Sequence, residues 1–278
     1  MNSRQTITPE LREWLLAQVA AGHSADRVLA SMQASGWDSS VAMEAIREVM
    51  PDALHDLASV ALEMPDLPNG AGHRVQAHDR WVDVLVCMRQ PRIVVFRGLL
   101  ADAECDALIE LARPRLSRSE TVVNRTGGSE VNAARTSQGM FFSRGEGALV
   151  GAVEARIAAL LNWPVDRGEG LQVLRYGVGA EYRPHFDYFD PAQPGSPAIL
   201  KRGGQRVGTV LMYLNTPESG GATTFPDAGI EVHAQRGSAV FFSYEQPSPL
   251  TRTLHGGAPV LAGEKWVATK WLRAGRFD

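Results

Sequence analysis

Two histidines and one aspartate are candidate metal ligands. In the segment YRPHFDYF, His185 and Asp187 are separated by one residue, so on a strand both side chains project from one face while Phe186 projects from the other. His255 follows much later, in TRTLHGGAPV, between the strand-like segments GSAVFFSY and KWVATKWL. Antiparallel packing can return it to the same face. Two imidazoles and one carboxylate leave the opposite coordination positions of a metal open, which non-haem Fe(II) oxygenases require.

Zinc is the competing metal, and a structural role is the alternative for each histidine. Catalytic zinc sites also use two histidines and an acid, but the helical H-E-x-x-H spacing is absent, and a strand-borne H-x-D favours iron. The chain has seven histidines, so an H-x-D triplet can arise by chance. An isolated histidine in a β domain is commonly a hydrogen-bonded structural residue. The surrounding residues must therefore decide.

The first fifty residues have apolar spacing typical of helices. Three stripes follow one another: Leu11, Leu15 and Val19, then Val28, Leu29 and Met32, then Met43, Ile46 and Val49. We predict a small helical domain over residues 1–50, which is either a plain helical cap or a surface for protein contact or oligomerisation. The Pro- and Gly-containing stretch MPDLPNGAGH predicts a linker over residues 51–78.

Residues 79–278 have the pattern of a β domain with flanking helices. Helices are predicted at about residues 102–112 and 148–161. Short strands dominate after Gly170, and they include LQVLRY, RVGTVLMYLN, GSAVFFSY and KWVATKWL. This order of elements predicts an α+β protein whose larger domain is an antiparallel sandwich or barrel.

The segment from Leu171 to Trp271 resembles the catalytic domain of the prolyl 4-hydroxylases, especially the plant and bacterial members. The matching text is LQVLRYGVGAEYRPHFDYF, QRVGTVLMYLN, GGATTFP, RGSAVFF and LHGGAPVLAGEKWVATKWLR, and the upstream piece RTSQGMFF is also similar. The resemblance implies a double-stranded β-helix, which is a jelly-roll or cupin-like core, with the H-x-D motif and the distal histidine at its open end. It also implies Fe(II), 2-oxoglutarate as cosubstrate, O2, and ascorbate as reductant.

A lysine interrupts an otherwise apolar strand face. In KWVATKWL, period-two alternation places four residues on one face: Lys265, Val267, Thr269 and Trp271. A buried ammonium is costly unless an anion pairs with it. With the resemblance, this predicts that Lys265 holds the distal carboxylate of 2-oxoglutarate; the alternative is a snorkelling edge lysine. The resemblance also implies that Tyr176 and Thr209 hydrogen-bond the cosubstrate, with sheet packing as their alternative role.

Five further residues match positions that line the substrate groove of the family: Arg135, Ser137, Glu169, Tyr182 and Trp271. The resemblance alone supports these roles. Arg135 is equally compatible with a surface ion pair, and Trp271 with a core aromatic, because aromatic residues on strands commonly pack. Gly220 and Gly221 indicate a tight turn before a strand.

The implied reaction is hydroxylation coupled to decarboxylation of 2-oxoglutarate to succinate and CO2. Related halogenases have a small residue in place of the carboxylate ligand, whereas Asp187 is retained here, so hydroxylation is favoured. The predicted substrate is a peptidyl proline. One alternative is a hydroxylase of a free amino acid or small metabolite, and another is a non-catalytic binding module on the same fold.

The bulk composition argues against two classes of partner. The chain of 278 residues is 44% hydrophobic and can bury a large core. A net charge of -3 gives no general attraction to nucleic acid. No apolar run approaches the ~18 residues of a membrane helix, and the first residues lack a signal-peptide pattern. We therefore expect a cytoplasmic protein without membrane contact, whose cysteines, Cys87 and Cys105, are reduced and structural.

Overall fold

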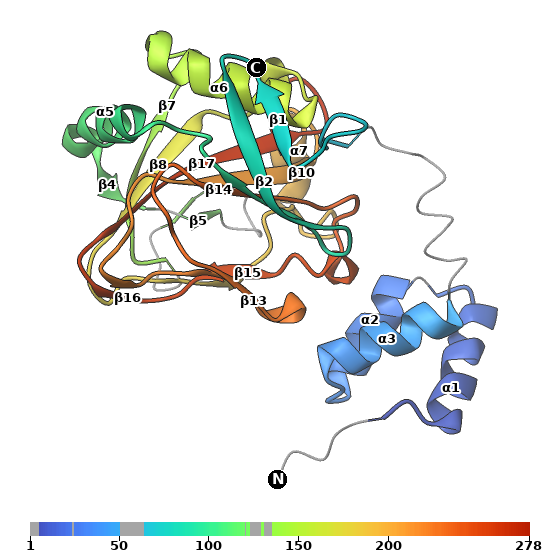
Figure 1. The fold of residues 1–278 in the computed structure, drawn as a ribbon. Helices are drawn as coiled ribbons and strands as arrows, with labels where there is room; N and C mark the ends of the chain where they lie inside the picture. The colour runs from blue at the N-terminus through green and yellow to red at the C-terminus, as the bar shows by residue number, and fades with distance from the viewer. Residues whose placement is uncertain (1–5, 24, 51–63, 120, 123–128, 131–134) are drawn as a thin grey trace. The chain divides into compact units, whose positions relative to one another are not determined.

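The computed structural model describes residues 6–23, 25–50, 64–119, 121–122, 129–130 and 135–278. Two compact units divide the chain near residue 62 (Figure 1). The first is helical, and the second combines sheets with helices. Each unit has its own apolar core.

The helical unit confirms most of the predicted apolar stripes. Within its described residues it contains α1 (Pro9–Ala20), α2 (Ala25–Ala34) and α3 (Ser39–Val49). Thr8 caps α1, because its hydroxyl accepts a hydrogen bond from the Leu11 amide. The buried residues common to the prediction and the structure are Leu11, Leu15, Val28, Leu29, Met32, Met43 and Ile46. Val19 is 41% exposed, so its place in the first stripe was wrong.

Antiparallel sheets form the larger unit. Among the described residues the large sheet has the strand order β1 (Arg74–Ala77), β2 (Arg80–Met88), β3 (Arg92–Arg97), β14 (Ala239–Ser243), β10 (Arg206–Tyr213), β17 (Lys265–Arg273), β8 (Leu171–Tyr176), β7 (Gln138–Phe142) and β4 (Ser117–Arg118). The small sheet has the order β13 (Ile230–Val232), β12 (Thr223–Phe225), β15 (His255–Gly257) and β9 (Tyr182–His185). The remaining pairs are β11 (Ser219–Gly220) with β16 (Val260–Ala262), and β5 (Thr121–Val122) with β6 (Ser129–Glu130).

Helices accompany the large sheet. The α-helices of this unit are α5 (Asp102–Ala112), α6 (Gly147–Leu161) and α7 (Ser196–Leu200). The 3-10 helices of this unit are η1 (Arg113–Arg115), η2 (Val165–Arg167) and η3 (Pro226–Ala228), whereas the first two residues of η4 (Pro249–Thr251) are grouped with the helical unit. The two predicted helices are thus confirmed as α5 and α6. Glu104, in the first turn of α5, accepts a hydrogen bond from the Ala101 amide.

Two apolar layers surround the large sheet. One layer joins it to α5 and α6 and includes Leu108, Ile157 and Ala268. The other joins the large sheet to the small one, where Leu174 and Phe242 belong to the same cluster as Phe225 of β12. Two sheets with helices on the outer face of one of them are the predicted α+β arrangement with a jelly-roll-like core.

Strand β17 contributes to both layers. Trp266 and Ala268 belong to the cluster that contains the helices, whereas Val267 belongs to the cluster between the sheets. Lys270 lies on the helix side, where its ammonium pairs with the buried carboxylate of Glu154. The alternation predicted for KWVATKWL is therefore present, and it directs Lys265 to the opposite side from Lys270.

The predicted linker over residues 51–78 extended too far. Its last residues form β1, in which Val75 and Ala77 are buried and alternate with exposed residues. Asp66 is also held to the larger unit, because its amide donates to the Leu161 carbonyl and its carboxylate pairs with Arg92. The glycines and prolines of this stretch thus shape an ordered entry to the sheet. Residues 51–63 lie outside the described residues.

Both cysteines are free, but only one is a core residue. Cys105 is buried in the layer that contains α5, whereas Cys87 is exposed on β2, where its Sγ accepts a hydrogen bond from Arg92. No helix in the described part of the chain combines the length and the apolar content needed to cross a membrane.

Candidate active site

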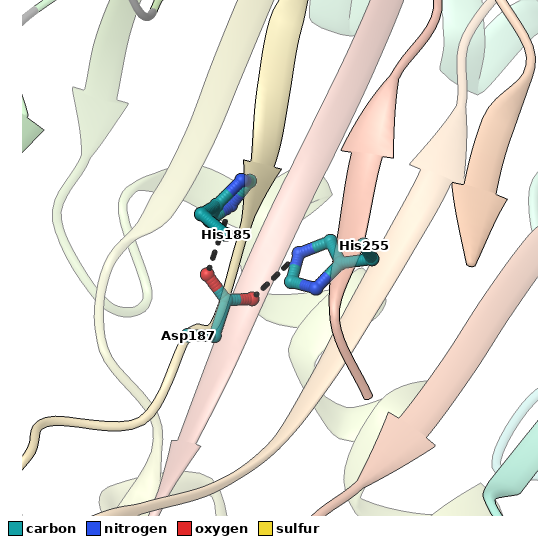
Figure 2. Close-up of side chains that lie close together, drawn as sticks. All are labelled: His185, Asp187 and His255. Atoms are coloured by element: carbon teal, nitrogen blue, oxygen red, sulfur yellow. Dashed lines mark ion pairs between the residues drawn. The ribbon is translucent and has the colours of Figure 1, made fainter. Parts of the chain in front are cut away.

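Strand pairing brings the three predicted metal ligands together. β15 pairs with β9 in a register that places His255 opposite His185. Asp187 lies in a bend after β9, so the strand ends before the second member of the H-x-D motif. Figure 2 shows the three side chains directed toward one another. Asp187 Oδ1 lies 3.5 Å from His185 Nε2, and Oδ2 lies 3.4 Å from His255 Nε2.

The main chain orients both imidazole rings through hydrogen bonds to their Nδ1 atoms. His185 Nδ1 lies 2.9 Å from the Arg183 carbonyl oxygen, and His255 Nδ1 lies 3.0 Å from that of Thr253. A carbonyl oxygen only accepts hydrogen bonds, so Nδ1 carries the proton in each ring. In the neutral form of each ring, Nε2 is then the atom with a lone pair, and it faces Asp187. One ligand atom from each of the three residues lies within 4.8 Å of the others, which is compatible with one shared metal ion.

The electrostatics favour the protonation states that metal ligands need. Burial alone would raise the pKa of Asp187, but the facing His255 and His185 hold that pKa well below its usual value. Burial, followed by the nearby charge of His255, lowers the pKa of His185. At neutral pH the carboxylate is therefore ionised and the His185 imidazole is neutral.

Lys265 lies in the same pocket as the three ligands. Its side chain is buried with 3% exposure, and within the described residues it has no hydrogen bond and no ion pair. Its Nζ lies 5.7 Å from the ring centre of Tyr176 and 5.8 Å from that of Tyr213. Burial lowers the pKa of Lys265 to about 8. The alternative of an edge lysine that extends into solvent is excluded by this burial.

Two glycines make room for this lysine. A Cβ on Gly221 would lie 3.2 Å from Lys265 Cδ, and one on Gly257 would lie 3.9 Å from Lys265 Nζ. Gly220 and Gly221 both have positive φ angles, 75° and 71°, but the predicted tight turn is not present, because Gly220 belongs to β11 and pairs with Val260 of β16. Tyr176, predicted to contact the cosubstrate, lines the pocket beside Lys265 and pairs with it across β8 and β17.

Thr209 has a partner that the sequence did not predict. Its hydroxyl donates to Asp187 Oδ2 over 2.7 Å and lies 3.1 Å from the Tyr244 hydroxyl. The expectation was a hydrogen bond to the cosubstrate. Thr209 does line the pocket, but its proton is engaged by the candidate metal ligand.

Three of the five residues predicted to contact substrate line the pocket: Arg135, Tyr182 and Trp271. The Tyr182 ring stacks on His185 with centroids 3.6 Å apart, and the Arg135 guanidinium lies 4.7 Å from the Tyr182 ring centre. The buried Nε of Arg135 and Nε1 of Trp271 have no hydrogen-bond partner in the described part of the chain. The surface ion pair considered for Arg135 is not present among those residues.

The other two predicted substrate residues have different surroundings. Ser137 is buried and donates to the Ser119 hydroxyl over 2.9 Å. Glu169 accepts two hydrogen bonds from Arg206 and one from Arg273. Neither lines the pocket with the metal ligands. Both predictions came from matched positions, and the partners that engage these side chains are distant in sequence.

Sequence reasoning missed four residues that support the site. Arg206 donates to the Asp187 carbonyl over 3.3 Å. Tyr213 donates to Thr223 over 2.8 Å beside Lys265, and Tyr244 contacts Thr209. Strand alternation from Thr209 reaches Tyr213, so that signal was available. Tyr244 and Thr223 had no comparable signal.

Comparisons with known proteins agree with this geometry. Residues 171–273 match the model of the 2OG-Fe(II) oxygenase superfamily. The chain is 41% identical over 214 residues to prolyl 4-hydroxylase 2 of Arabidopsis thaliana, and the match covers 68% of this chain and 69% of that protein. It is 39% identical over 221 residues to prolyl 4-hydroxylase 5 of the same plant, with coverage of 72% and 73%. The chain belongs to the prolyl 4-hydroxylase family.

A solved structure supports the same fold. The viral collagen prolyl hydroxylase of Paramecium Bursaria Chlorella virus-1, in its 2-oxoglutarate complex, is similar with a TM-score of 0.50 and 29% sequence identity. The match covers 65% of this chain and 95% of that one. The predicted double-stranded β-helix is thereby confirmed, and this prolyl 4-hydroxylase-like chain is a 2-oxoglutarate-dependent dioxygenase. Membership implies the use of Fe(II), 2-oxoglutarate and O2.

Removing any one of the three ligands is expected to weaken metal binding by at least ~100-fold, because an incomplete set of ligands holds the ion poorly. The substitutions are His185→Ala, Asp187→Ala and His255→Ala. The measurement is titration of the full chain with Mn(II) or Co(II). The control is His233→Ala, which removes an exposed histidine outside the cluster. Unchanged affinity in any of the three variants would contradict the assignment.

Proposed function

We propose that this protein hydroxylates a peptidyl proline, with Fe(II) held by His185, Asp187 and His255 and with 2-oxoglutarate anchored by Lys265. The observation that carries the proposal is the buried ammonium of Lys265, which faces the pocket of the three ligands without an anionic partner among the described residues. A dicarboxylate cosubstrate supplies that anion. It also has a second end that can bind the metal.

The pocket offers further polar groups to the same cosubstrate. Tyr213 donates to Thr223 Oγ1, so Thr223 keeps its own proton for an oxygen of a ligand. Thr223 lines the pocket with Lys265 and Tyr176. We assign Lys265 and Thr223 to the distal carboxylate, and Tyr176 to the wall beside it. Thr209 is assigned to Asp187 because its proton is already engaged there.

Iron held by His185, Asp187 and His255 would supply the oxidising chemistry: one atom of O2 would enter succinate as 2-oxoglutarate loses CO2, and the other would enter the substrate as a hydroxyl group. The chain's own residues position the reactants. His185 and His255 direct their Nε2 atoms toward Asp187 because the main chain holds their Nδ1 protons. Lys265 fixes one end of the cosubstrate, so its other end meets the metal in one orientation.

Two unpartnered donors support a peptide as substrate. Arg135 Nε and Trp271 Nε1 are buried, and both residues line the pocket. A buried donor without an acceptor is costly, and a peptide chain brings carbonyl acceptors at close spacing. The Tyr182 ring, stacked on His185, places an aromatic side chain in the same pocket as Arg135 and Trp271. The relatives named prolyl 4-hydroxylases and the collagen prolyl hydroxylase point to the same substrate class.

The substrate proposal predicts peptide-dependent turnover. The full chain is incubated with Fe(II), 2-oxoglutarate and ascorbate, and both succinate and the mass of the peptide are measured. We expect a proline-rich peptide to gain one oxygen per modified proline, with matching succinate, and we expect free L-proline to remain unmodified. Turnover of free proline alone would support the metabolite hydroxylase instead. If succinate forms but neither the peptide nor free proline gains oxygen, a different substrate is favoured. If the chain binds 2-oxoglutarate but forms no succinate, the binding module is favoured.

Lys265→Met is expected to raise the concentration of 2-oxoglutarate needed for half-saturation by at least ~10-fold, or about 1.4 kcal/mol, because it removes a charge-assisted contact. The affinity is measured by titration of the Mn(II)-loaded chain with 2-oxoglutarate. Lys201→Met is the control, since Lys201 is exposed. An unchanged titration for Lys265→Met would remove Lys265 from the cosubstrate site.

The affinity for 2-oxoglutarate should fall as the pH rises through about 8, the pKa of Lys265 in the unliganded protein. Above this pH the free protein loses the cation, so binding must first restore a proton, and the affinity is expected to be about 10-fold lower near pH 9 than near pH 7. The stability of the unliganded protein should move the other way, because the unfolded chain holds that proton up to higher pH.

Lys265→Arg tests the origin of this pH dependence. A guanidinium stays charged throughout the range, so this variant should bind 2-oxoglutarate with a flat pH profile even if its affinity is lower. The same fall in the arginine variant would assign the pH dependence to another group.

A further inference from the structure

A buried pair of hydroxyl groups ends on the candidate metal ligand Asp187. Thr209 Oγ1 lies 2.7 Å from Asp187 Oδ2, and the Tyr244 hydroxyl lies 3.1 Å from Thr209 Oγ1. Thr209 and Tyr244 are 1% and 2% exposed, so water does not compete for these hydrogen bonds. Thr209 lies in β10 and Tyr244 follows the neighbouring strand β14, and the Tyr244 amide donates to the Val207 carbonyl. The sheet itself therefore fixes the positions of both hydroxyls.

The carboxylate determines the direction of both hydrogen bonds. A carboxylate that binds a metal is ionised and can only accept, so the Thr209 O–H must donate to Asp187. Thr209 Oγ1 then has only lone pairs left, and it accepts from the Tyr244 O–H. Burial, followed by the charge of Asp187, raises the pKa of Tyr244 well above its usual value, which keeps this proton on the phenol.

We propose that Tyr244 is a positioning residue of the metal centre, which acts through Thr209 to hold Oδ2 of Asp187 and to leave Oδ1 as the oxygen for the metal. The inference rests on the proposed metal site and adds a role for two residues outside the ligand set. Within the described residues, Oδ1 accepts no hydroxyl hydrogen bond, whereas Oδ2 has the Thr209 donor. An oxygen that is already hydrogen-bonded is the weaker metal ligand.

One consequence concerns the number of coordination positions. A carboxylate that binds through one oxygen takes one position, whereas a chelating carboxylate takes two. With two histidines and one carboxylate oxygen as ligands, a six-coordinate ion would keep three positions for the cosubstrate and O2. Tyr244 and Thr209 therefore help the carboxylate to occupy only one position.

The same pocket contains a matched control pair. Tyr213 donates to Thr223 over 2.8 Å, and both residues are buried. Neither has a hydrogen bond to His185, Asp187 or His255 among the described residues. Tyr213→Phe thus removes a buried tyrosine hydroxyl from a Tyr–Thr pair in the same way as Tyr244→Phe, but away from the metal ligands.

The test measures Mn(II) affinity of the full chain from the electron paramagnetic resonance signal of the free ion, with no cosubstrate present. Thr209→Val should weaken binding at least ~10-fold, as is typical when a partner of a metal ligand is lost. Tyr244→Phe should weaken Mn(II) binding about threefold, because the lost hydrogen bond is to Thr209 and not to the metal ligand itself. Thr209→Ser keeps the hydroxyl and should bind Mn(II) like the unmodified chain. Tyr213→Phe should also leave Mn(II) affinity unchanged.

The double variant separates a relay from independent packing effects. If Tyr244 acts through Thr209, Tyr244→Phe has no further effect on Mn(II) affinity in the Thr209→Val background. Additive losses would overturn the relay, as would unchanged affinity in both single variants or an equal loss in Tyr213→Phe. Failure of the metal site itself looks different, because the unmodified chain would then bind Mn(II) no better than His255→Ala.

Discussion

Backbone hydrogen bonds between β15 and β9 bring His255 opposite His185, and the rest of the site depends on this pairing. Each strand is short, so neither histidine is held by a long element of its own. The register is supported on both sides: β12 pairs with the far edge of β15, and a Cβ on Gly256 would lie only 2.9 Å from the Tyr182 carbonyl oxygen. The absence of a side chain at Gly256 therefore permits the close approach that sets the distance between the two imidazoles.

Two lysines on one strand show how differently the fold treats a buried charge. Lys270 faces the helices, where Glu154 and the Glu169 carbonyl surround its ammonium. Lys265 faces the pocket, where its ammonium lies near the rings of Tyr176 and Tyr213 and has no hydrogen bond or ion pair among the described residues. A buried, unpaired ammonium is costly, and the fold does supply a carboxylate partner for Lys270. That it supplies none for Lys265 among the described residues indicates that the pocket is built to receive an anion from a ligand. This contrast is a stronger argument for an anionic ligand than the burial of Lys265 alone.

The sequence predicted those features that depend on local periodicity. Strand alternation placed Lys265 on the pocket face, and the spacing of H-x-D placed two ligands on one side, although β9 ends at His185 and a bend presents Asp187. Features set by contacts between distant segments were not accessible. Thr209 Oγ1 lies 2.7 Å from Asp187 Oδ2 because the fold brings β10 next to the bend at Asp187, and no pattern within β10 predicts that neighbour.

Two residues predicted to contact substrate lie outside the pocket of the metal ligands, and their surroundings have a common physical cause. Ser137 and Glu169 are polar residues whose matched positions suggested a groove, yet each is buried and engaged by a partner from another segment, Ser119 and Arg206 respectively. The extent of the linker was misjudged for a similar reason. The glycines and prolines near residue 70 are visible in the sequence, whereas the pairing of β1 with β2 is a contact between separate segments.

One buried guanidinium connects the substrate side of the pocket to the metal side. Arg206 lies 4.1 Å from the ring centre of Trp271 and donates to the Asp187 carbonyl, while Glu169 accepts two of its hydrogen bonds. Burial would lower the pKa of Arg206, but Glu169 raises it above its usual value, so the cation is permanent. The Trp271 ring and the main-chain carbonyl of Asp187 thus both contact the guanidinium of Arg206. The contact that fixes the Trp271 indole and the hydrogen bond that fixes the bend at Asp187 therefore share one donor group, so the positions of the two residues are linked through Arg206.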